Sequence, residues 1–355
     1  QSNASTVTDS QIFGNNAGGA GGGVAIVNSG SLDDLSLLKL SNNTIGNNSA
    51  KKGGGIYAIG SNFTVEGGHI AANTAQNGGG VWASNSVIKM INGYVMSNTA
   101  ANGGGMYLND GDVSLTMDRV SIISNSATEA AGGISCRTGG IDINGGAQIY
   151  QNIIASVSNS ETGEESERVQ SNLCLYDGKT ISVTTPETEL DGTGYFTSLI
   201  SVSIMDDYGV GSITSAYNEN YSERYSEFFC PDNENHKLVY DNGIVYIGYR
   251  VILDCGTGEW REEGVLRNKT LNISDPERAG YCFGGWFVGE NGYDITKPVT
   301  KSFTLTAKWL KDGENGVSIT PNKLYMLTEQ PAKVYVGAYK GGRLTSVVVR
   351  DSKAY

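Results

Sequence analysis

The sequence predicts an all-β chain that begins with a right-handed parallel β-helix and continues with smaller β-rich modules. A block of about 25 residues recurs along roughly the first 150 residues, which is typical of a solenoid. Within each block, short apolar–polar alternations lie between turn residues. Glycine contributes 49 of the 355 residues and proline only 6, a balance that suits many tight turns better than a proline-rich stalk.

One block shows how the strands follow from the pattern. Its alternating segments cover residues 56–58, 63–65 and 69–70, with turns at 60–62 and 67–68. Three short strands leave no room for a helix, and each strand type recurs once per block. Strands of one type are therefore expected to pair in parallel between successive blocks, about 4.8 Å apart.

Alignment of the blocks gives four apolar columns that we expect inside the coil. Stacking these side chains removes apolar surface from water, which stabilises the fold by about 25 cal/mol per Å² buried. The alternate residues, Lys39, Thr64, Lys89 and Ser114, are polar and are expected outside. The columns are Leu38, Phe63, Ile88, Val113 and Ile141; Leu40, Val65, Met90, Leu115 and Ile143; Ile45, Ile70, Val95, Ile122 and Ile149; and Val24, Ile56, Val81, Met106 and Ile134.

An asparagine column and a glycine run mark the corner of each block. The asparagines have two structural interpretations: a left-handed turn residue, or a ladder of hydrogen-bonded amides. The glycines are expected to supply positive φ at a tight corner, since the Lys-Ser/Thr of a phosphate-binding loop does not follow them. The asparagine column is Asn16, Asn48, Asn73, Asn98 and Asn125.

Three aromatic residues are the candidate ligand-binding residues. Tyr57, Trp82 and Tyr107 share a column whose parity points outward. Stacked aromatics on successive coils are a surface for sugar rings or for a protein partner. The alternative is that they stabilise the outer face by cross-strand stacking, at about 0.2–1 kcal/mol per pair.

The repeat resembles those of polymorphic outer-membrane proteins and related bacterial adhesins. Its motifs are Gly-Gly-[Gly]-[Val/Ile/Met] and [Phe/Ile/Val]-x-x-Asn, with Phe only at Phe13-Gly-Asn-Asn16. The resemblance covers residues 11–152, implies a β-helical passenger, and carries over no catalytic residue. Residues 200–246 resemble the closing coils of large clostridial surface β-helices, and we assign them to a cap over the exposed end of the helix.

A second resemblance covers residues 249–310. Residues 280–287 read Gly-Tyr-Cys-Phe-Gly-Gly-Trp-Phe, Pro298-Val-Thr300 follows, and Leu305-Thr-Ala-Lys-Trp309 closes the segment. This resembles the Listeria–Bacteroides repeat, or internalin B-repeat, a small β-grasp-like module of secreted and wall-linked bacterial proteins. Cys255 and Cys282 stand where that family usually has polar residues, and their pairing is left open.

The last segment is similar to part of an immunoglobulin-like module. Its alternating stretches lie at 317–319, 333–336 and 344–349, and residues 338–344 are similar to the Ala-x-Tyr-x-x-Gly-[Arg/Lys]-Leu segment of such modules. Forty residues are about half of such a sandwich. The expected organisation is therefore an expression-tag remnant at 1–4, a capped β-helix at 5–247, the internalin B-repeat-like module at 248–311 and the partial immunoglobulin-like segment at 312–355.

Composition and motifs also indicate what is not expected. The net charge of −12 and the lack of a Lys/Arg cluster argue against nucleic acid. No apolar run is long enough for membrane insertion. Asp110 and Asp112 are interpreted as turn residues, His69 as a surface residue, Cys136 as a buried filler and Cys174 as facing out. We expect no catalytic residue, metal or cofactor.

The sequence therefore favours a non-enzymatic adhesin or stalk on a bacterial, Gram-positive cell surface. It would be extracellular, monomeric and attached through regions outside this chain, with a host protein or a glycan surface as its partner. The alternatives are a polysaccharide-active β-helix enzyme, which needs carboxylates gathered on one outer face, and a glycan-binding module that uses the aromatic column. Fold alone does not separate them.

Overall fold

The chain forms two units. Contacts divide it into residues 1–248 and 249–355. Residues 1–4, the expected tag remnant, lie outside the described part of the chain. The computed structural model describes residues 5–27, 38–155, 168–176, 178–183, 187–190, 194–197, 199–205, 209–217, 219–328, 330–340 and 343–351.

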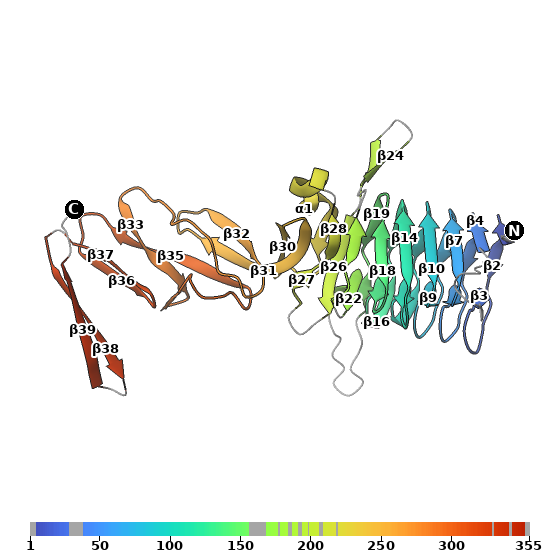
Figure 1. Ribbon diagram of the computed structural model, residues 1–355, viewed down its shortest axis with the longest axis horizontal. Coiled ribbons are helices and arrows are strands. Elements are labelled where there is room, and N and C mark those ends of the chain that lie inside the picture. Colours follow the sequence, from blue (N-terminus) through green and yellow to red (C-terminus); the bar gives the residue numbers. More distant parts are fainter. Residues whose placement is uncertain are drawn as a thin grey trace. The chain divides into compact units, whose positions relative to one another are not determined.

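The first unit is built from three rows of short strands that pair in parallel. The rows run side by side along the unit (Figure 1), and one strand of each row belongs to each block of the sequence. We call one such turn of three strands a coil. The first row consists of β1 (Ser5–Thr8), β4 (Leu38–Ser41), β7 (Asn62–Glu66), β10 (Val87–Ile91), β14 (Ser114–Asp118), β18 (Gly140–Ile143), β23 (Ile181–Val183) and β28 (Thr214–Tyr217).

The second and third rows are joined by one long strand, β26 (Leu199–Met205). Its first residues pair with β19 of the second row and its later residues with β22 of the third. The second row is β2 (Gln11–Phe13), β5 (Thr44–Gly46), β8 (His69–Ala71), β11 (Tyr94–Met96), β15 (Val120–Ile123) and β19 (Ala147–Tyr150). The third is β3 (Val24–Val27), β6 (Ile56–Ile59), β9 (Val81–Ser84), β13 (Met106–Leu108), β17 (Ile134–Cys136) and β22 (Leu173–Tyr176).

This large, nearly closed parallel sheet is compatible with the expected parallel β-helix. The third and fourth apolar columns have the predicted register, so that Ile70 pairs with Ile45 and Val95, and Val81 pairs with Ile56 and Met106. Side chains at these positions are almost fully buried. The period-2 alternation thus places one side of every strand in a common core.

The first two columns have a different register in one coil. Leu115, and not Val113, pairs with Ile88, while Met117 takes the place beside Met90 that was expected for Leu115. Thr116 accordingly replaces Ser114 in the outward column between them. The predicted alignment of this coil was wrong by two residues.

An enlarged turn before β14 causes this shift. Successive corner asparagines are 27 positions apart in this coil and 25 in the coil before it. The additional length lies at Asp110 and Gly111, whose φ values of 57° and 67° make a left-handed turn. Val113 remains buried beside the turn, so its apolar character did not reveal that it precedes the strand.

The corner asparagines form the amide ladder. Each Nδ2 donates to the Oδ1 of the next ladder residue at 2.9–3.0 Å from Asn48 to Asn172. Asn15, and not Asn16, begins it, because Asn15 Nδ2 is the group that donates to Asn48 Oδ1. The left-handed residue lies one position earlier, as at Ala72 before Asn73. The ladder also includes Asn73, Asn98, Asn125 and Asn152.

A small sheet lines this corner, and two short helices lie near the end of the unit, before β29 and β30. Phe228 in α1 is fully buried, and Phe229 pairs with Ile200 of β26. The corner sheet is β12 (Thr99–Asn102), β16 (Ser126–Ala130), β20 (Ile153–Ile154) and β21 (Val169–Gln170). The later elements are β24 (Glu187–Leu190), β25 (Gly194–Thr197), β27 (Gly211–Ser212), the 3₁₀ helix η2 (Glu219–Arg224), α1 (Tyr225–Phe228), β29 (Phe229–Pro231) and β30 (His236–Asp241).

The second unit is a mixed sheet with two hairpins. Strand β31 (Ile244–Asp254) contains the boundary, and its part from Tyr249 onward pairs antiparallel with β32 (Trp260–Val265) and parallel with β35 (Phe303–Lys311). Strand β33 (Tyr281–Val288) lies antiparallel on the other side of β35 and pairs with β34 (Asn291–Gly292). Val251, Leu305 and Trp286 are buried in the core of this unit.

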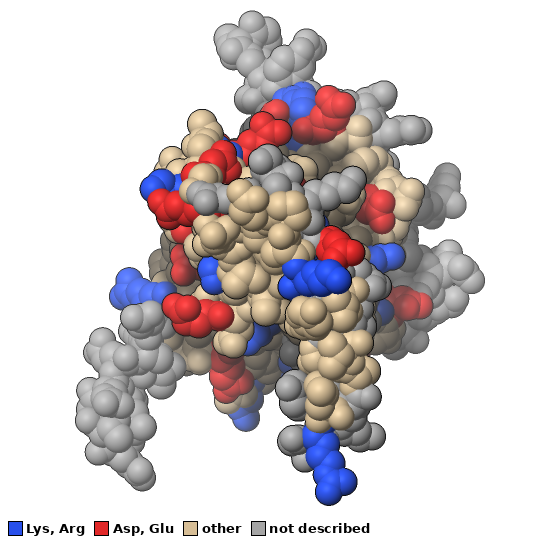
Figure 2. Space-filling model, turned by 90° about the vertical axis from the view of Figure 1, so that its left-hand side faces the viewer, with Lys and Arg blue, Asp and Glu red and all other residues tan. Residues whose placement is uncertain are grey.

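The hairpin β36 (Gly316–Thr320) with β37 (Lys323–Leu327) packs against β33. Tyr325 meets Phe283 edge-to-face at 5.7 Å, and Gly285 lies under Thr320 and Tyr325. A second hairpin follows, β38 (Lys333–Lys340) with β39 (Arg343–Asp351). On the face drawn in Figure 2, the described basic and acidic side chains are interspersed.

Candidate functional site

The predicted aromatic column exists, on the outward side of the third row. Trp82 pairs directly with Tyr57 in the preceding coil and with Tyr107 in the following coil. Their chain neighbours on either side, such as Val81 and Ala83, are buried in the core. The period of the repeat and the parity of the strands thus bring the three predicted residues together.

Trp82 is nevertheless hidden from solvent. Its ring stacks on Tyr57 with a centroid distance of 4.8 Å and an interplanar angle of 14°, and Lys52 Nζ lies 4.8 Å from its centroid. Only 3% of Trp82 is exposed. A cation over a ring and a stacked neighbour both stabilise the outer face. This burial favours a structural role for Trp82 and leaves Tyr57 and Tyr107 as the partly exposed members of the column.

A second cation continues this face beyond Tyr107. The guanidinium of Arg137 lies 5.9 Å from the ring of Tyr107 and 4.4 Å from that of Tyr176. Burial is the largest cause that raises the pKa of Tyr176 above its usual value. The rings of Tyr57 and Tyr107 are thus each in contact with a neighbouring ring or cation.

The sequence reasoning missed a second stacked pair, on the second row. His69 and Tyr94 pair between β8 and β11, and their rings stack at 5.1 Å with an angle of 23°. His69 is exposed, as expected, and Tyr94 is 43% exposed. Their places in one column were visible in the sequence, but a histidine is not usually counted with aromatic residues.

Among the residues that the structure describes, the acidic side chains and thiols form no metal-binding cluster. Within the described ranges, no group of three or more His, Cys, Asp or Glu is placed to hold a metal ion. Asp110 occupies a turn and accepts a hydrogen bond from Asn109 Nδ2 at 2.7 Å. The five thiols are free, which leaves Cys255 and Cys282 unpaired.

Cys136 and Cys174 lie on opposite sides of the third row, and both are buried. Cys136 is buried, as predicted, and burial raises the pKa of its thiol to about 11. Cys174 lies in the outward column, as its parity predicted, but it is covered and only 1% exposed. Ser171 Oγ lies 3.3 Å from Cys174 Sγ, within hydrogen-bond distance. Burial raises the pKa of the Cys174 thiol to about 11.

A carboxylate that sequence reasoning missed ends the asparagine ladder. Asp232 Oδ1 accepts a hydrogen bond from Asn172 Nδ2 at 2.6 Å, and its Oδ2 accepts from Asn172 N at 3.0 Å and from Ser203 Oγ at 2.7 Å. Burial raises the pKa of Asp232, and these hydrogen bonds oppose the rise. The spacing of the ladder asparagines did not point to Asp232, because Asp232 lies 60 residues after Asn172, whereas the ladder residues from Asn48 to Asn152 are 25–27 residues apart.

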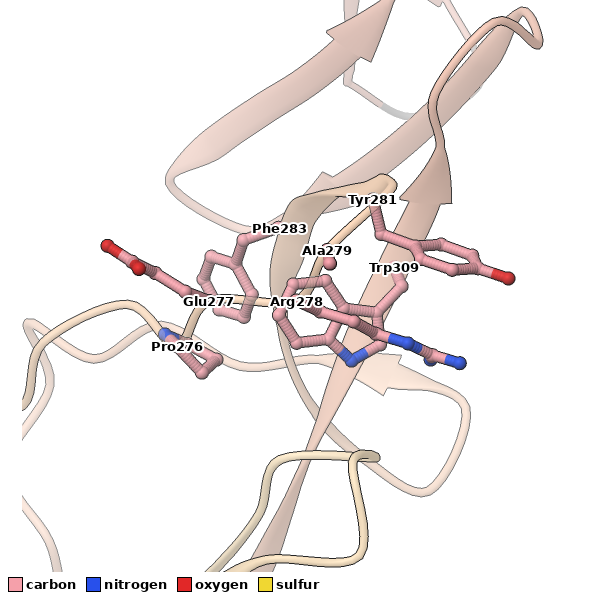
Figure 3. A pocket seen from close by; sticks show the side chains of 7 residues that line it. All are labelled: Pro276, Glu277, Arg278, Ala279, Tyr281, Phe283 and Trp309. Atoms are coloured by element: carbon pink, nitrogen blue, oxygen red, sulfur yellow. The ribbon is translucent and has the colours of Figure 1, made fainter.

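The third feature missed is a shallow hollow in the second unit, which we call the aromatic hollow (Figure 3). Its aromatic residues come from β33 and β35, while the others lie on the loop before β33. The motif that suggested the module contains these aromatics, but it gives no sign that they border a hollow. The hollow is lined by Pro276, Glu277, Arg278, Ala279, Tyr281, Phe283 and Trp309.

No helix in the described ranges is both long and apolar enough to cross a membrane. Comparison of the chain with known protein families, with curated proteins and with solved structures found no match.

Proposed function

We propose that this chain is a non-enzymatic adhesive stalk of a Gram-positive bacterial surface protein, located outside the cell and attached to a host or glycan surface. The observation that carries the proposal is the uninterrupted corner ladder, which connects successive coils from Asn15 to Asp232. The ladder amides from Asn48 to Asn172 are satisfied within the protein, and fully satisfied polar networks rigidify a fold. Such a stack suits a spacer that holds its ends apart.

The second unit supports the same proposal. Its strand order, β32-β31-β35-β33 with a parallel central pair, suits a β-grasp-like module. This order adds to the motif resemblance to internalin B-repeats, which implies a secreted, wall-linked protein. The partial immunoglobulin-like segment at 312–355 remains a proposal of the same kind. Tyr57, Trp82 and Tyr107 are proposed to stiffen the stalk, and the partly exposed Tyr57 and Tyr107 are proposed to contact a partner.

Retention of the whole chain on immobilised mucin and on immobilised plant polysaccharides tests this function. We expect retention above that on a bare surface, with no release of reducing ends into the medium. Tyr107→Ala should weaken retention if the column contacts the partner, and His69→Ala on the second row is the matched control. Release of sugar would show an enzyme, and a failure of retention on every surface would contradict the attachment.

A further inference from the structure

We propose that the aromatic hollow of the second unit binds a neutral pyranose residue of a glycan. The inference deepens the proposed function, on which it rests, by naming the part of the chain that contacts sugar. Three side chains would make the contacts: Trp309 through its ring, Arg278 as a hydrogen-bond donor and Glu277 as an acceptor.

Trp309 presents a ring surface and no free donor. Its Nε1 donates to the carbonyl oxygen of Cys255 at 2.8 Å, so the indole N–H is already satisfied. Phe283 packs edge-on against the ring at 5.9 Å, which fixes its orientation. The side chain is still partly exposed at the hollow. A fixed, half-exposed aromatic ring is suited to the apolar C–H face of a pyranose.

Arg278 is positioned without a carboxylate partner. Its guanidinium lies 4.0 Å from the ring of Tyr281 and 5.9 Å from that of Trp309. In the described part of the chain no carboxylate forms an ion pair with it. The aromatic contacts hold the planar group while its N–H donors stay available for hydroxyl oxygens.

Glu277 supplies the complementary acceptor. Its side chain is exposed, and within the described residues no cation pairs with it. In Figure 3 Glu277 and Arg278 extend to opposite sides of the Trp309 ring. A sugar hydroxyl is both donor and acceptor, so a pyranose lying on the ring can bond the carboxylate at one edge and the guanidinium at the other.

The charges favour an uncharged ligand. Glu277 and Arg278 cancel at the hollow, and the whole chain carries a net charge of −12. A carboxylated sugar or an acidic peptide would meet the Glu277 carboxylate and a repulsive overall field. A neutral hexose or N-acetylhexosamine meets neither penalty, and it uses both charged groups as hydrogen-bond partners.

Saturation-transfer NMR of the whole chain with single sugars tests the site. The probes are methyl β-glucoside, methyl β-galactoside and methyl N-acetyl-β-glucosaminide, with methyl β-glucuronide and an acidic peptide as charged comparisons. We expect at least one neutral probe to bind, with its ring C–H protons closest to the protein. Arg278→Ala and Glu277→Gln should each raise the Kd of that probe roughly tenfold, because each removes a charge-assisted hydrogen bond.

A blocking variant and two controls make the result specific. Ala279 is exposed at the rim, so Ala279→Arg fills the hollow without removing a proposed contact and should abolish binding. Glu290→Gln and Lys301→Ala change exposed charges that do not line the hollow and should leave the Kd unchanged. No binding of any neutral probe at concentrations that saturate a millimolar site would overturn the proposal.

Further outcomes would contradict the sugar site in the aromatic hollow or the proposed attachment. Equal affinity in the wild type and the Ala279→Arg variant would place the sugar elsewhere, and a preference for glucuronide or acidic peptide would show the wrong ligand class. Undiminished retention of Ala279→Arg on mucin, with pyranoside binding lost, would support the proposed attachment and contradict the role of the hollow as its sugar-contacting part. If the wild-type chain were retained on no surface but still bound the pyranosides, only the proposed attachment would be contradicted.

Discussion

Asp232 stands where every preceding coil has an asparagine. Each of Asn125 and Asn152 donates one Nδ2 hydrogen and its backbone N–H to the next ladder oxygen, and donates its other Nδ2 hydrogen to a carbonyl oxygen of an earlier coil. The last asparagine, Asn172, therefore needs a side-chain acceptor beyond it that does not itself have to donate onward. A carboxylate meets this need, because an ionised Asp only accepts hydrogen bonds. The aligned amide dipoles also place their positive ends toward it. Burial of the charge opposes this arrangement and raises the pKa of Asp232.

The Asp232→Asn variant should change how stability depends on pH. Because the folded-state pKa of Asp232 is raised above its ordinary value of 3.8, the stability that protonation contributes is fully present below pH 3.8. That contribution is lost as the pH rises through the folded-state pKa. It amounts to about 1.4 kcal/mol for each pKa unit that separates the folded from the unfolded state. An asparagine keeps one oxygen that accepts from Asn172 and has no charge to bury, and the acceptor oxygen that it lacks lowers stability by the same amount at every pH. The variant should therefore gain thermal stability relative to wild type as the pH rises from 3 to 7.

Thermal midpoints across this pH range, measured in parallel for both proteins, provide the comparison. Asp142→Asn, at an outward position of β18, is the control for loss of one carboxylate elsewhere on the stack. A difference between Asp232→Asn and wild type that is constant with pH would contradict the assigned cause.

The corner elements explain why glycine occurs there in threes. Only the first glycine of a triplet has a positive φ, such as 65° at Gly78. The next two are required by close approach between coils: a Cβ on Gly79 would lie 2.5 Å from the carbonyl oxygen of Gly104, and one on Gly80 would lie 2.6 Å from that of Gly105. The expectation that the whole run supplies positive φ was thus correct for one position in three.

Gly79→Ala should destabilise the stack, and Gly140→Ala should not. The alanine at 79 meets backbone oxygens of the next coil, which cannot move independently of the corner, and overpacking of this kind costs about 1–3 kcal/mol. A Cβ added to Gly140 in β18 would meet no atom within 4 Å, and the φ of this glycine is not positive. Denaturant midpoints of the two variants test this, and equal midpoints would contradict the steric account.

Much of the stack was predictable because its period is written in the sequence. The second and third rows follow from single-residue parity and a constant spacing, so Ile70 and Val81 were placed correctly. The register of Leu115 was not, because an apolar residue before the strand satisfies the same pattern. Parity shows which side of a strand a residue lies on, but not which other side chains cover it. The burial of Cys174 and Trp82 on the outward side could therefore not be predicted from parity. The aromatic hollow depends on a loop whose path no local pattern specifies.

At the scale of the whole molecule, each unit has a hydrophobic core of its own. The first unit buries the stacked columns of its coils, whereas the second buries a separate set that includes Val251, Trp286 and Leu305. Units with separate cores are expected to fold as separate cooperative systems. The expected domain boundary at 247/248 lies next to the observed division after Gly248.

Calorimetry of the whole chain should therefore show two thermal transitions, each assignable by one variant. Leu305 is fully buried, and Leu305→Ala removes core volume at a cost of about 2–5 kcal/mol. It should lower the midpoint of one transition by at least about 8 °C, since the second unit is of the size for which 1 kcal/mol shifts the midpoint by about 4–8 °C. Gly79→Ala should lower only the other transition, because its clash lies within the coils of the first unit. If either variant moved both transitions together, the two cores would be one cooperative system, and a stalk with independently folding modules would not describe this chain.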